Sequence, residues 1–350
     1  MQRVAIIGSG NWGSTVGKIV GSNLYKLDGF EKEVKMWVYE EIIEGVKLTE
    51  IINNQHTNPK YLPGIKLPEN LVAESDLLSV TKDCDYLIFV LPHQFLGFVL
   101  QKLKGNVKKS AVAISLLKGF ISSKETHEIS LASHVIKSEL GIDCGVLMGA
   151  NIASEVAKET FCESTIAFED IKIAHRFKEI FQTEYFRIAS TRDISVCEIC
   201  GALKNIVALA SGIADGLKFG DNTKAAIIRI GFIEIKKFIT TFFSDQDPQN
   251  DTYLESCGIA DLITTCYGGR NRKIGEALAT DGGKLEDIEK RLLNGQSAQG
   301  PITAEETFNF LKLKNKIADF PILTGIHRIC IGEVKPDQII DFLRNHSCHN

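Results

Sequence analysis

The stretch that decides the fold is RVAIIGSGNWG, which occupies residues 3–13. Residues 3–7 form a short apolar run typical of a buried strand, and helical spacing begins at residue 12. Between them lies Gly8-Ser9-Gly10-Asn11-Trp12-Gly13, with Gly-x-Gly-x-x-Gly spacing. The first two glycines allow a tight turn and close approach of a pyrophosphate, and the third lets the helix pack on the strand. The helix N-terminus adds N–H donors and partial positive charge, so the run predicts a dinucleotide-binding turn.

Short β-rich runs alternate with helical stretches through the first half of the chain. Strands are predicted at residues 3–8, 34–39, 86–91, 111–117, 144–149, 165–168 and 185–189. Helical spacing occupies intervening segments such as residues 12–20 and 129–140. This alternation is typical of an α/β domain with a doubly wound, mostly parallel sheet. Residues 53–70 are polar and hold three prolines, which predicts a long surface excursion.

From about residue 191 strand signals disappear and helical spacing remains. Helices are predicted at residues 196–214, 223–243, 273–279, 302–313 and 338–343, and a polar loop at residues 244–251. We therefore place a boundary near Arg192. An α/β domain is predicted over residues 1–192, and an all-helical domain over residues 193–350.

The composition narrows the class of protein. With 350 residues, 44% of them hydrophobic and 24% charged, the chain fits a folded protein of about two domains. A net charge of −4 excludes a broad cationic surface, so nucleic acid is not an expected partner. No uninterrupted apolar run approaches the ~20 residues of a membrane span, so none is expected.

The nine cysteines, an odd number, predict free thiols in a reducing compartment. Cys197 and Cys200 have the spacing of a redox motif, but a buried helix would also place two small apolar side chains there. Cysteine and histidine do not cluster at zinc spacing, so no metal is expected. A strand pattern begins at Arg3 and leaves no room for a signal peptide, which makes the cytoplasm the expected location.

Two acidic residues, Glu40 and Glu41, follow the second predicted strand. A carboxylate at this place can accept hydrogen bonds from the adenosine ribose and repels a 2′-phosphate, which favours NAD(H) over NADP(H). The alternative is a pair of solvated glutamates at a helix start.

Polar groups also follow three other strands, where open α/β sheets bind ligands. Lys118 ends an apolar run, which predicts a partly desolvated cation, although a surface lysine is the alternative. Asn151 follows another strand. His93 fits either a catalytic base or a loop histidine that packs on the cofactor.

The helical segment 201–208 carries a single charge, Lys204, among apolar residues. Burial and a second nearby cation would both lower the pKa of this lysine and make it a proton acceptor near neutral pH. The alternative is a lysine whose ammonium reaches the surface from a buried helix.

Residues 268–273 read Gly-Gly-Arg-Asn-Arg-Lys, so three cations occupy the first turn of a predicted helix. Cations there oppose the helix dipole by roughly 0.3–1 kcal/mol each. A bound anion such as a substrate phosphate would remove that conflict by docking on the N–H groups and Arg270. A Gly-Gly turn with exposed arginines is the alternative.

Six motifs occur in one order along nearly the whole chain, from Val4 to about Leu343. They are residues 8–13 (GSGNWG), 92–95 (PHQF), 149–155 (GANIASE), 201–208 (GALKNIVA), 220–224 (GDNTK) and 268–272 (GGRNR). Together they closely resemble the eukaryotic, soluble NAD-dependent glycerol-3-phosphate dehydrogenases. The resemblance implies a Rossmann-type domain followed by a helical substrate domain, usually in a homodimer. It also implies NAD as cofactor and reversible reduction of dihydroxyacetone phosphate to sn-glycerol 3-phosphate.

The resemblance assigns roles to individual residues. Lys204 matches the proton acceptor and Lys118 the lysine beside the substrate. The other active-site polar residues that it implies are Asn205, Asp261 and Thr265, and the substrate phosphate contacts are Arg270 and Asn271. The implied cofactor contacts are Gly8, Ser9, Gly10, Asn11, Trp12, Gly13, Tyr39, Phe95, Lys118, Ala153, Arg270 and Gln299.

Two positions depart from the family pattern. Tyr39 stands where the animal enzymes have phenylalanine, and Ser297 stands where they have a lysine. Two other functions stay open from the residues alone. A dehydrogenase of 3-hydroxy acids would need a carboxylate clamp in place of residues 268–273. An NAD(H) sensor or scaffold without activity would have lost Lys204, Lys118 or Arg270.

Overall fold

A computed structural model describes residues 1–123, 125–243, 250–293 and 298–349 of the chain. The chain divides into two compact units: unit 1 is Met1–Leu117 with Ala132–Ile194, and unit 2 is Lys118–Leu131 with Ser195–Asn350. The predicted domains, 1–192 and 193–350, differ from these units mainly in residues 118–131. That segment belongs to unit 2 because Phe120, Ile129 and Leu131 pack into its helical core. Ser297 and most of the predicted loop 244–251 lie outside the described residues.

Unit 1 is built on an eight-stranded sheet with the strand order β14-β13-β12-β9-β8-β1-β2-β7. Its strands are β1 (Val4–Ile7), β2 (Val34–Trp37), β7 (Leu71–Glu74), β8 (Tyr86–Phe89), β9 (Val112–Ser115), β12 (Asp143–Met148), β13 (Cys162–Ala167) and β14 (Phe186–Thr191). Neighbouring strands run parallel except β12 and β13. The prediction of a doubly wound, mostly parallel sheet is confirmed.

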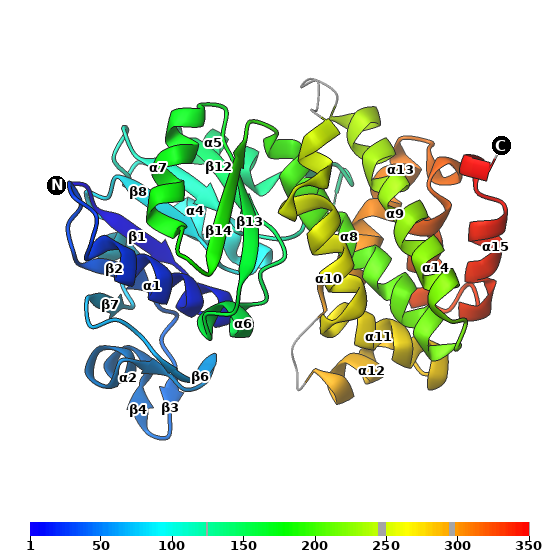
Figure 1. Ribbon diagram of the computed structural model, residues 1–350, viewed down its shortest axis with the longest axis horizontal. Helices are drawn as coiled ribbons and strands as arrows, with labels where there is room; N and C mark the ends of the chain where they lie inside the picture. Colours follow the sequence, from blue (N-terminus) through cyan, green and yellow to red (C-terminus); the bar gives the residue numbers. More distant parts are fainter. Residues whose placement is uncertain (124, 244–249, 294–297, 350) are drawn as a thin grey trace. The chain divides into compact units, whose positions relative to one another are not determined.

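Helices cover both faces of this sheet. They are α1 (Asn11–Leu24), α3 (Leu77–Thr81), α4 (Leu96–Leu103), α5 (Ala132–Leu140), α6 (Ala153–Ala157) and α7 (Ile171–Phe181). The chain moves one way from β1 through β2 to β7, and the other way from β8 through β9 to β12. Right-handed connections therefore put α1 on one face and α4 and α5 on the other. In agreement, α1 packs on α6 and α7 while α4 packs on α3 and α5, and Figure 1 shows α1 and α7 on the near face.

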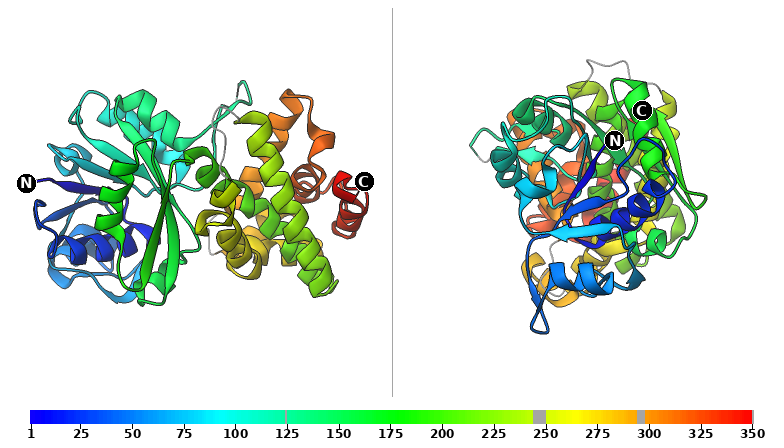
Figure 2. Two further views of the ribbon diagram at one scale, coloured as in Figure 1. Left: turned by 45° about the horizontal axis from the view of Figure 1, so that its top comes forward. Right: turned by 90° about the vertical axis from the view of Figure 1, so that its left-hand side faces the viewer.

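The predicted surface excursion 53–70 contains more structure than expected. It continues α2 (Leu48–Gln55) and forms a small sheet from β5 (Thr57–Asn58) and β6 (Leu62–Lys66). A hairpin of β3 (Ile42–Ile43) and β4 (Val46–Lys47) precedes it and projects beside α2 in Figure 1 and in the right-hand view of Figure 2. The edge strand β7, directly after the excursion, was not predicted.

Unit 2 is helical apart from a hairpin of β10 (Ile121–Ser122) and β11 (Ile129–Ser130). Its longer helices are α8 (Ile194–Gly216), α9 (Asp221–Phe242), α10 (Asp261–Tyr267), α11 (Gly269–Thr280), α12 (Leu285–Leu292), α13 (Gln299–Leu313), α14 (Pro321–Cys330) and α15 (Ile339–Arg344). The shorter turns are η2 (Asn250–Leu254), η3 (Ser256–Ala260), η4 (Ile317–Asp319), η5 (Pro336–Gln338) and η6 (Ser347–His349). In unit 1, η1 (His93–Phe95) precedes α4. The predicted helical character of the second half is confirmed.

Helix α8 forms the centre of unit 2. It has 23 residues with a mean hydropathy of 1.5 over its most apolar window, so by length and composition it could cross a membrane. The sequence analysis did not identify this helix as long and apolar enough to cross a membrane, because Glu198 and Lys204 interrupt its apolar run. The whole window is buried inside unit 2, as in a core helix. Cys197 and Cys200 are among its buried residues, and all nine cysteines are free thiols, as predicted.

Two glycines let α8 approach α11 more closely than other residues would. A Cβ atom on Gly212 would lie 1.9 Å from the carbonyl oxygen of Arg272, and one on Gly216 would lie 2.6 Å from that of Glu276. Gly275 makes the reciprocal contact, with the carbonyl oxygen of Leu209 at 2.1 Å. The backbones of the two helices are therefore in direct contact, and this packing positions the start of α11 beside α8.

Candidate active site

The glycine-rich turn of unit 1 has the geometry that its sequence predicts. Gly8 has φ +124°, and a Cβ atom there would lie 2.4 Å from the carbonyl oxygen of Val90. A Cβ atom on Gly13 would lie 2.3 Å from the carbonyl oxygen of Gly8, while Gly10 faces open space. No side chain caps the N-terminus of α1, and its first turn has no acidic residue. An uncapped helix terminus behind an open glycine turn fits the pyrophosphate of NAD.

Other cofactor candidates of unit 1 lie near the same edge of the sheet. The strand order β8-β1-β2 brings Phe95 and Tyr39, which follow β8 and β2, to either side of the turn. Both rings are exposed, by 53% and 73% of their residue surface, so each presents a free aromatic face. Ala153 also lies near the start of α1, because its carbonyl oxygen accepts a hydrogen bond from Thr15 Oγ1 at 3.1 Å.

The side chains of Trp12, Glu40 and Glu41 all contact other residues of the protein. The indole of Trp12 packs edge-on against Phe186, with ring centroids 6.1 Å apart. Glu40 accepts hydrogen bonds from the backbone N–H and hydroxyl of Thr49, at 3.2 and 2.6 Å, in the first turn of α2. Glu41 pairs with Lys60 and accepts a hydrogen bond from Tyr61. Both carboxylates therefore have partners within the protein, so neither is a glutamate that only solvent contacts.

In unit 2, a buried carboxylate joins the two lysines that sequence analysis selected. Lys204 on α8 pairs with Oδ1 of Asp261, the first residue of α10. Lys118 Nζ lies 3.3 Å from Oδ2 of the same carboxylate. The side chains of Lys204 and Asp261 are 5% and 3% exposed, and that of Lys118 is 28% exposed. The interpretation of Lys204 as a lysine reaching the surface is therefore wrong.

This environment changes the proton affinity of Lys204. Burial lowers its pKa to about 7, and the cation of Lys118 acts in the same direction, while the carboxylate of Asp261 opposes both. A pKa lowered toward neutrality makes both protonation states of this amine accessible near neutral pH. Such a group serves as proton donor in one reaction direction and as acceptor in the other.

A distorted helix presents Asp261 to the lysines. Residues Ser256–Ala260 form a π-helical turn directly before α10, and such turns are frequent at functional sites. Gly258 permits it, because a Cβ atom there would lie 2.2 Å from the carbonyl oxygen of Tyr253. Thr265 Oγ1 donates to the carbonyl oxygen of Asp261 at 2.6 Å and lies 3.5 Å from its Oδ1.

Hydrogen bonds between side-chain amides connect Asn205, the neighbour of Lys204, with the start of α11. Asn205, the next residue on α8, accepts a hydrogen bond from Asn271 Nδ2 at 2.8 Å. Asn271 Oδ1 in turn accepts from the backbone N–H of Gly300 on α13, also at 2.8 Å. One N–H of the Asn271 amide is thus used within the protein, and the second N–H of its NH2 group remains available as a donor to a phosphate.

The first turn of α11 combines a sharp bend with exposed charge. Gly268 precedes the helix without a side-chain cap, and Gly269 has φ +86°, a conformation that favours glycine. Arg270 is exposed at this terminus. An anion there would face backbone N–H groups and a guanidinium together.

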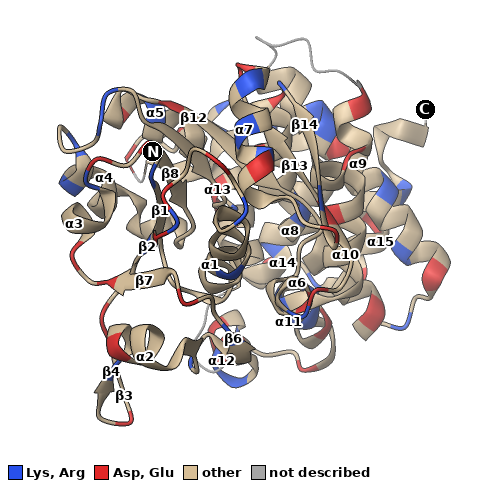
Figure 3. Cartoon of the chain, turned by 60° about the vertical axis from the view of Figure 1, so that its left-hand side comes forward, with Lys and Arg blue, Asp and Glu red and all other residues tan. Residues whose placement is uncertain are grey.

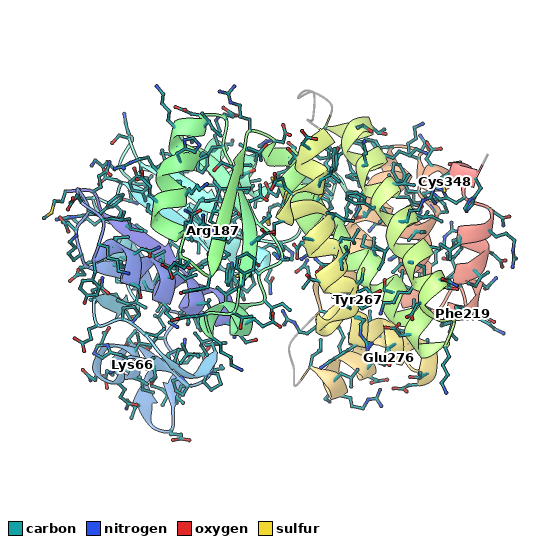
Figure 4. The ribbon with its side chains drawn as sticks, in the orientation of Figure 1. Lys66, Arg187, Phe219, Tyr267, Glu276 and Cys348 are labelled. Atoms are coloured by element: carbon teal, nitrogen blue, oxygen red, sulfur yellow. The ribbon has the colours of Figure 1, made fainter. Side chains whose placement is uncertain are left out.

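Sequence reasoning missed the ion pairs that hold α11. Asp215 near the end of α8 accepts hydrogen bonds from Lys224 of α9 at 3.0 and 2.8 Å. Arg272 lies 3.2 Å from Asp215 and 2.8 Å from Glu276. Lys224 also lies 4.4 Å from the ring centre of Tyr267, at the junction of α10 and α11. Figure 4 labels Tyr267 and Glu276 on these two helices.

Gln299 and His93 are the remaining candidates. Gln299 begins α13, and its amide donates to Thr303 at 3.3 Å. Together with Lys118 and Arg270 it belongs to unit 2, whereas the other cofactor candidates belong to unit 1. His93 begins η1 and is partly buried, which leaves both of its interpretations open. Acidic and basic residues are interspersed along the ribbon in Figure 3.

Comparison with known proteins identifies the family. A profile described as "NAD-dependent glycerol-3-phosphate dehydrogenase N-terminus" matches residues 3–174, and that of the C-terminus matches residues 193–341. The chain belongs to the NAD-dependent glycerol-3-phosphate dehydrogenase family. It is 52% identical over 346 residues to a Drosophila melanogaster relative, covering 99% of this chain and 94% of the relative. A human relative is 51% identical over 348 residues, covering 99% of both chains. Both are named "Glycerol-3-phosphate dehydrogenase [NAD(+)], cytoplasmic".

Solved structures agree with this assignment. Glycerol-3-phosphate dehydrogenase of Saccharomyces cerevisiae is 44% identical and superposes with a TM-score of 0.91, covering 98% of this chain and 99% of that one. The Plasmodium falciparum enzyme is 41% identical with a TM-score of 0.93, covering 98% and 95%. The predictions of an NAD-dependent oxidoreductase, of a Rossmann-type domain with a helical second domain, and of a cytoplasmic location are confirmed. Family membership favours this activity over the 3-hydroxy-acid and sensor alternatives.

Proposed function

We propose that the chain catalyses the reversible reduction of dihydroxyacetone phosphate by NADH to sn-glycerol 3-phosphate, with Lys204 moving the proton at the C2 oxygen. The observation that carries this proposal is the buried pair of Lys204 and Asp261. Asn205, the next residue after Lys204 on α8, accepts a hydrogen bond from Asn271 at the cation-rich start of α11. A proton-transfer group and an anion site therefore occur together in one helical unit.

In the reducing direction, the ammonium of Lys204 hydrogen-bonds the C2 carbonyl oxygen and donates its proton as hydride reaches C2. When bound, NADH supplies that hydride. In the oxidising direction, the neutral amine takes the proton from the C2 hydroxyl. The pKa of about 7 makes both forms available at neutral pH.

The other residues hold the substrate and stabilise charge. Lys118 and the amide of Asn205 stabilise the oxyanion that develops at C2, in surroundings from which water is largely excluded. The phosphate docks on the N–H groups that begin α11 and on Arg270. Asp261 fixes the position of Lys204, and Thr265 orients Asp261. Binding energy from the phosphate thereby positions the reacting carbon.

For the cofactor, we propose the turn at residues 8–13 for the pyrophosphate, with Tyr39, Phe95 and Ala153 as further contacts from unit 1. Lys118, Arg270 and Gln299 are the proposed contacts from unit 2. The support for this set is the uncapped start of α1 and the family resemblance of each position.

The test is NADH oxidation by the purified protein, followed at 340 nm with dihydroxyacetone phosphate, with unphosphorylated dihydroxyacetone, and with NADPH in place of NADH. Rapid oxidation of NADH with the phosphorylated ketone alone supports the reaction, the cofactor and the phosphate requirement together. Equal rates with the unphosphorylated ketone would overturn the phosphate site. Binding of NADH without consumption would overturn the enzyme.

We also propose that the chain forms a homodimer, as the family resemblance implies. Unit 2 exposes several large apolar side chains, among them Leu254, Ile263 and Tyr267. An interface would bury such side chains where they form a contiguous patch. Light scattering during size-exclusion chromatography gives about twice the chain mass if this is correct, and the chain mass if it is wrong.

A further inference from the structure

We propose that Asn58 is a positioning residue for NAD, which aims the backbone N–H of Gly10 at the cofactor's pyrophosphate. This inference rests on the proposed use of residues 8–13 as the cofactor turn. Asn58 belongs to the excursion that sequence analysis predicted as surface, and none of the motifs includes it. In the structure it is completely buried.

The amide of Asn58 holds the carbonyl group between the first two glycines. Its Nδ2 donates to the carbonyl oxygen of Ser9 at 3.0 Å and lies 2.9 Å from Ser14 Oγ. The hydroxyl of Ser14 donates to the same carbonyl oxygen at 3.1 Å. The carbonyl of Ser9 is thus fixed from two directions inside the protein.

Fixing this carbonyl also fixes the next N–H. The peptide group between Ser9 and Gly10 is planar and trans, so its C=O and N–H point in opposite directions. With the oxygen of Ser9 held toward buried Asn58, the N–H of Gly10 points away from the core. A Cβ atom on Gly10 would meet nothing within 4 Å, so the turn is open around the α-carbon of this residue. An N–H held in this orientation before binding is ready to donate to an anion.

Residues 58–61 also contact Asn11, the residue that follows Gly10. Asn58 Oδ1 accepts from the backbone N–H of Tyr61 at 3.2 Å, and the carbonyl oxygen of Tyr61 accepts from Asn11 Nδ2 at 2.7 Å. Both residues that flank Gly10 are therefore tied to residues 58–61. A glycine turn without such ties would be free to rotate its peptide groups, because glycine restricts the backbone least.

Asn53 provides a matched control. Its amide also makes two backbone hydrogen bonds, donating to the carbonyl oxygen of Ala73 at 2.9 Å and accepting from the N–H of Ala73 at 2.7 Å. It ties α2 to the edge strand β7 and makes none of the hydrogen bonds to the glycine turn. Removing either amide is expected to lower thermal stability, but only Asn58 orients the turn.

The experiment measures the dissociation constant of NADH by fluorescence titration, together with the midpoint of thermal unfolding, for the parent, Asn58→Ala, Ser14→Ala and Asn53→Ala. Ser14→Ala removes one tie to the Ser9 carbonyl with little change in volume, so it serves if Asn58→Ala does not fold. We expect the dissociation constant to rise about tenfold or more in Asn58→Ala and by a smaller factor in Ser14→Ala. In Asn53→Ala it should stay within about twofold of the parent.

Two results would overturn the positioning role alone: unchanged NADH affinity in the folded Asn58 and Ser14 variants, or an equal loss in Asn53→Ala. A parent protein that does not bind NADH would overturn the proposed function, and the role of Asn58 with it. The Michaelis constant for dihydroxyacetone phosphate, measured at saturating NADH, should not differ between parent and Ser14→Ala.

Discussion

Replacing Asp261 by asparagine should shift the pH dependence of ketone reduction, because this carboxylate opposes the two effects that lower the pKa of Lys204. Burial and the cation of Lys118 bring that pKa to about 7. The carboxylate of Asp261 is the group that limits the decrease. The variant keeps the size of the side chain and removes its charge.

The expected magnitude follows from the loss of one close opposite charge, which shifts a pKa by about 1–3 units. The pKa of Lys204 should therefore fall to between roughly 4 and 6. At pH 7 the ammonium fraction falls from about one half to about one tenth or less. Reduction, which uses the ammonium, should slow by about fivefold or more at pH 7 and regain rate as the pH is lowered.

The assay is kcat/KM for dihydroxyacetone phosphate between pH 5 and pH 9, in the parent, Asp261→Asn and Asp215→Asn. The parent should lose rate as the pH rises through about 7. The Asp261 variant should lose it about 1–3 units lower. Asp215 pairs with Lys224 and not with Lys204, so its variant should keep the apparent pKa of the parent. An unchanged apparent pKa in a folded Asp261→Asn protein would refute the reasoning.

Three further predictions test other parts of the structure. Arg270→Ala should lower kcat/KM for the phosphorylated ketone by about 10- to 100-fold, mainly through KM, since it removes a charge-assisted hydrogen bond; kinetics identical to the parent would reject the phosphate contact. Gly212→Ala should lower the midpoint of thermal unfolding, because its Cβ would lie 1.9 Å from a carbonyl oxygen of α11. Gly97→Ala, a helical glycine with nothing within 4 Å, should not lower it. His346 lies 3.3 Å from Glu234, and this contact raises the pKa of the imidazole. The pair therefore contributes its full stability below the unfolded pKa of about 6.5. That contribution is lost as the pH rises through the higher pKa of the folded protein. The deficit of His346→Gln in thermal unfolding should therefore shrink between pH 5.5 and pH 8.5, and a constant deficit would contradict the pairing.

The sheet could be predicted because its strands are apolar runs separated by helical spacing, a local pattern that survives in the fold. The residues that differ from prediction lack such a local signal. Strand β7 directly follows a polar segment, and backbone pairing with neighbouring β2 makes it a strand. The hairpin at residues 118–131 joins unit 2 through contacts such as that of Ser122 with Glu306, 184 positions further along the chain.

The same distinction applies to the candidate site. Lys204 was found because a single charge in an apolar helix is conspicuous, and Lys118 because it ends a strand. Asp261 has no such signal, and its role came from the family resemblance. Asn58 and Asp215 were missed, since an asparagine in a polar segment and an aspartate at a helix end look like surface residues until their partners are known.

If buried Lys204 carries the proton between substrate and protein, as we propose, its removal should slow turnover without weakening cofactor binding. The most direct measurement is kcat for dihydroxyacetone phosphate reduction in Lys204→Ala, together with the dissociation constant of NADH. We expect a loss of about 100- to 10,000-fold in kcat with NADH affinity retained, because proton transfer by a positioned group contributes a factor of that order. A folded variant that turns over at the rate of the parent would contradict it.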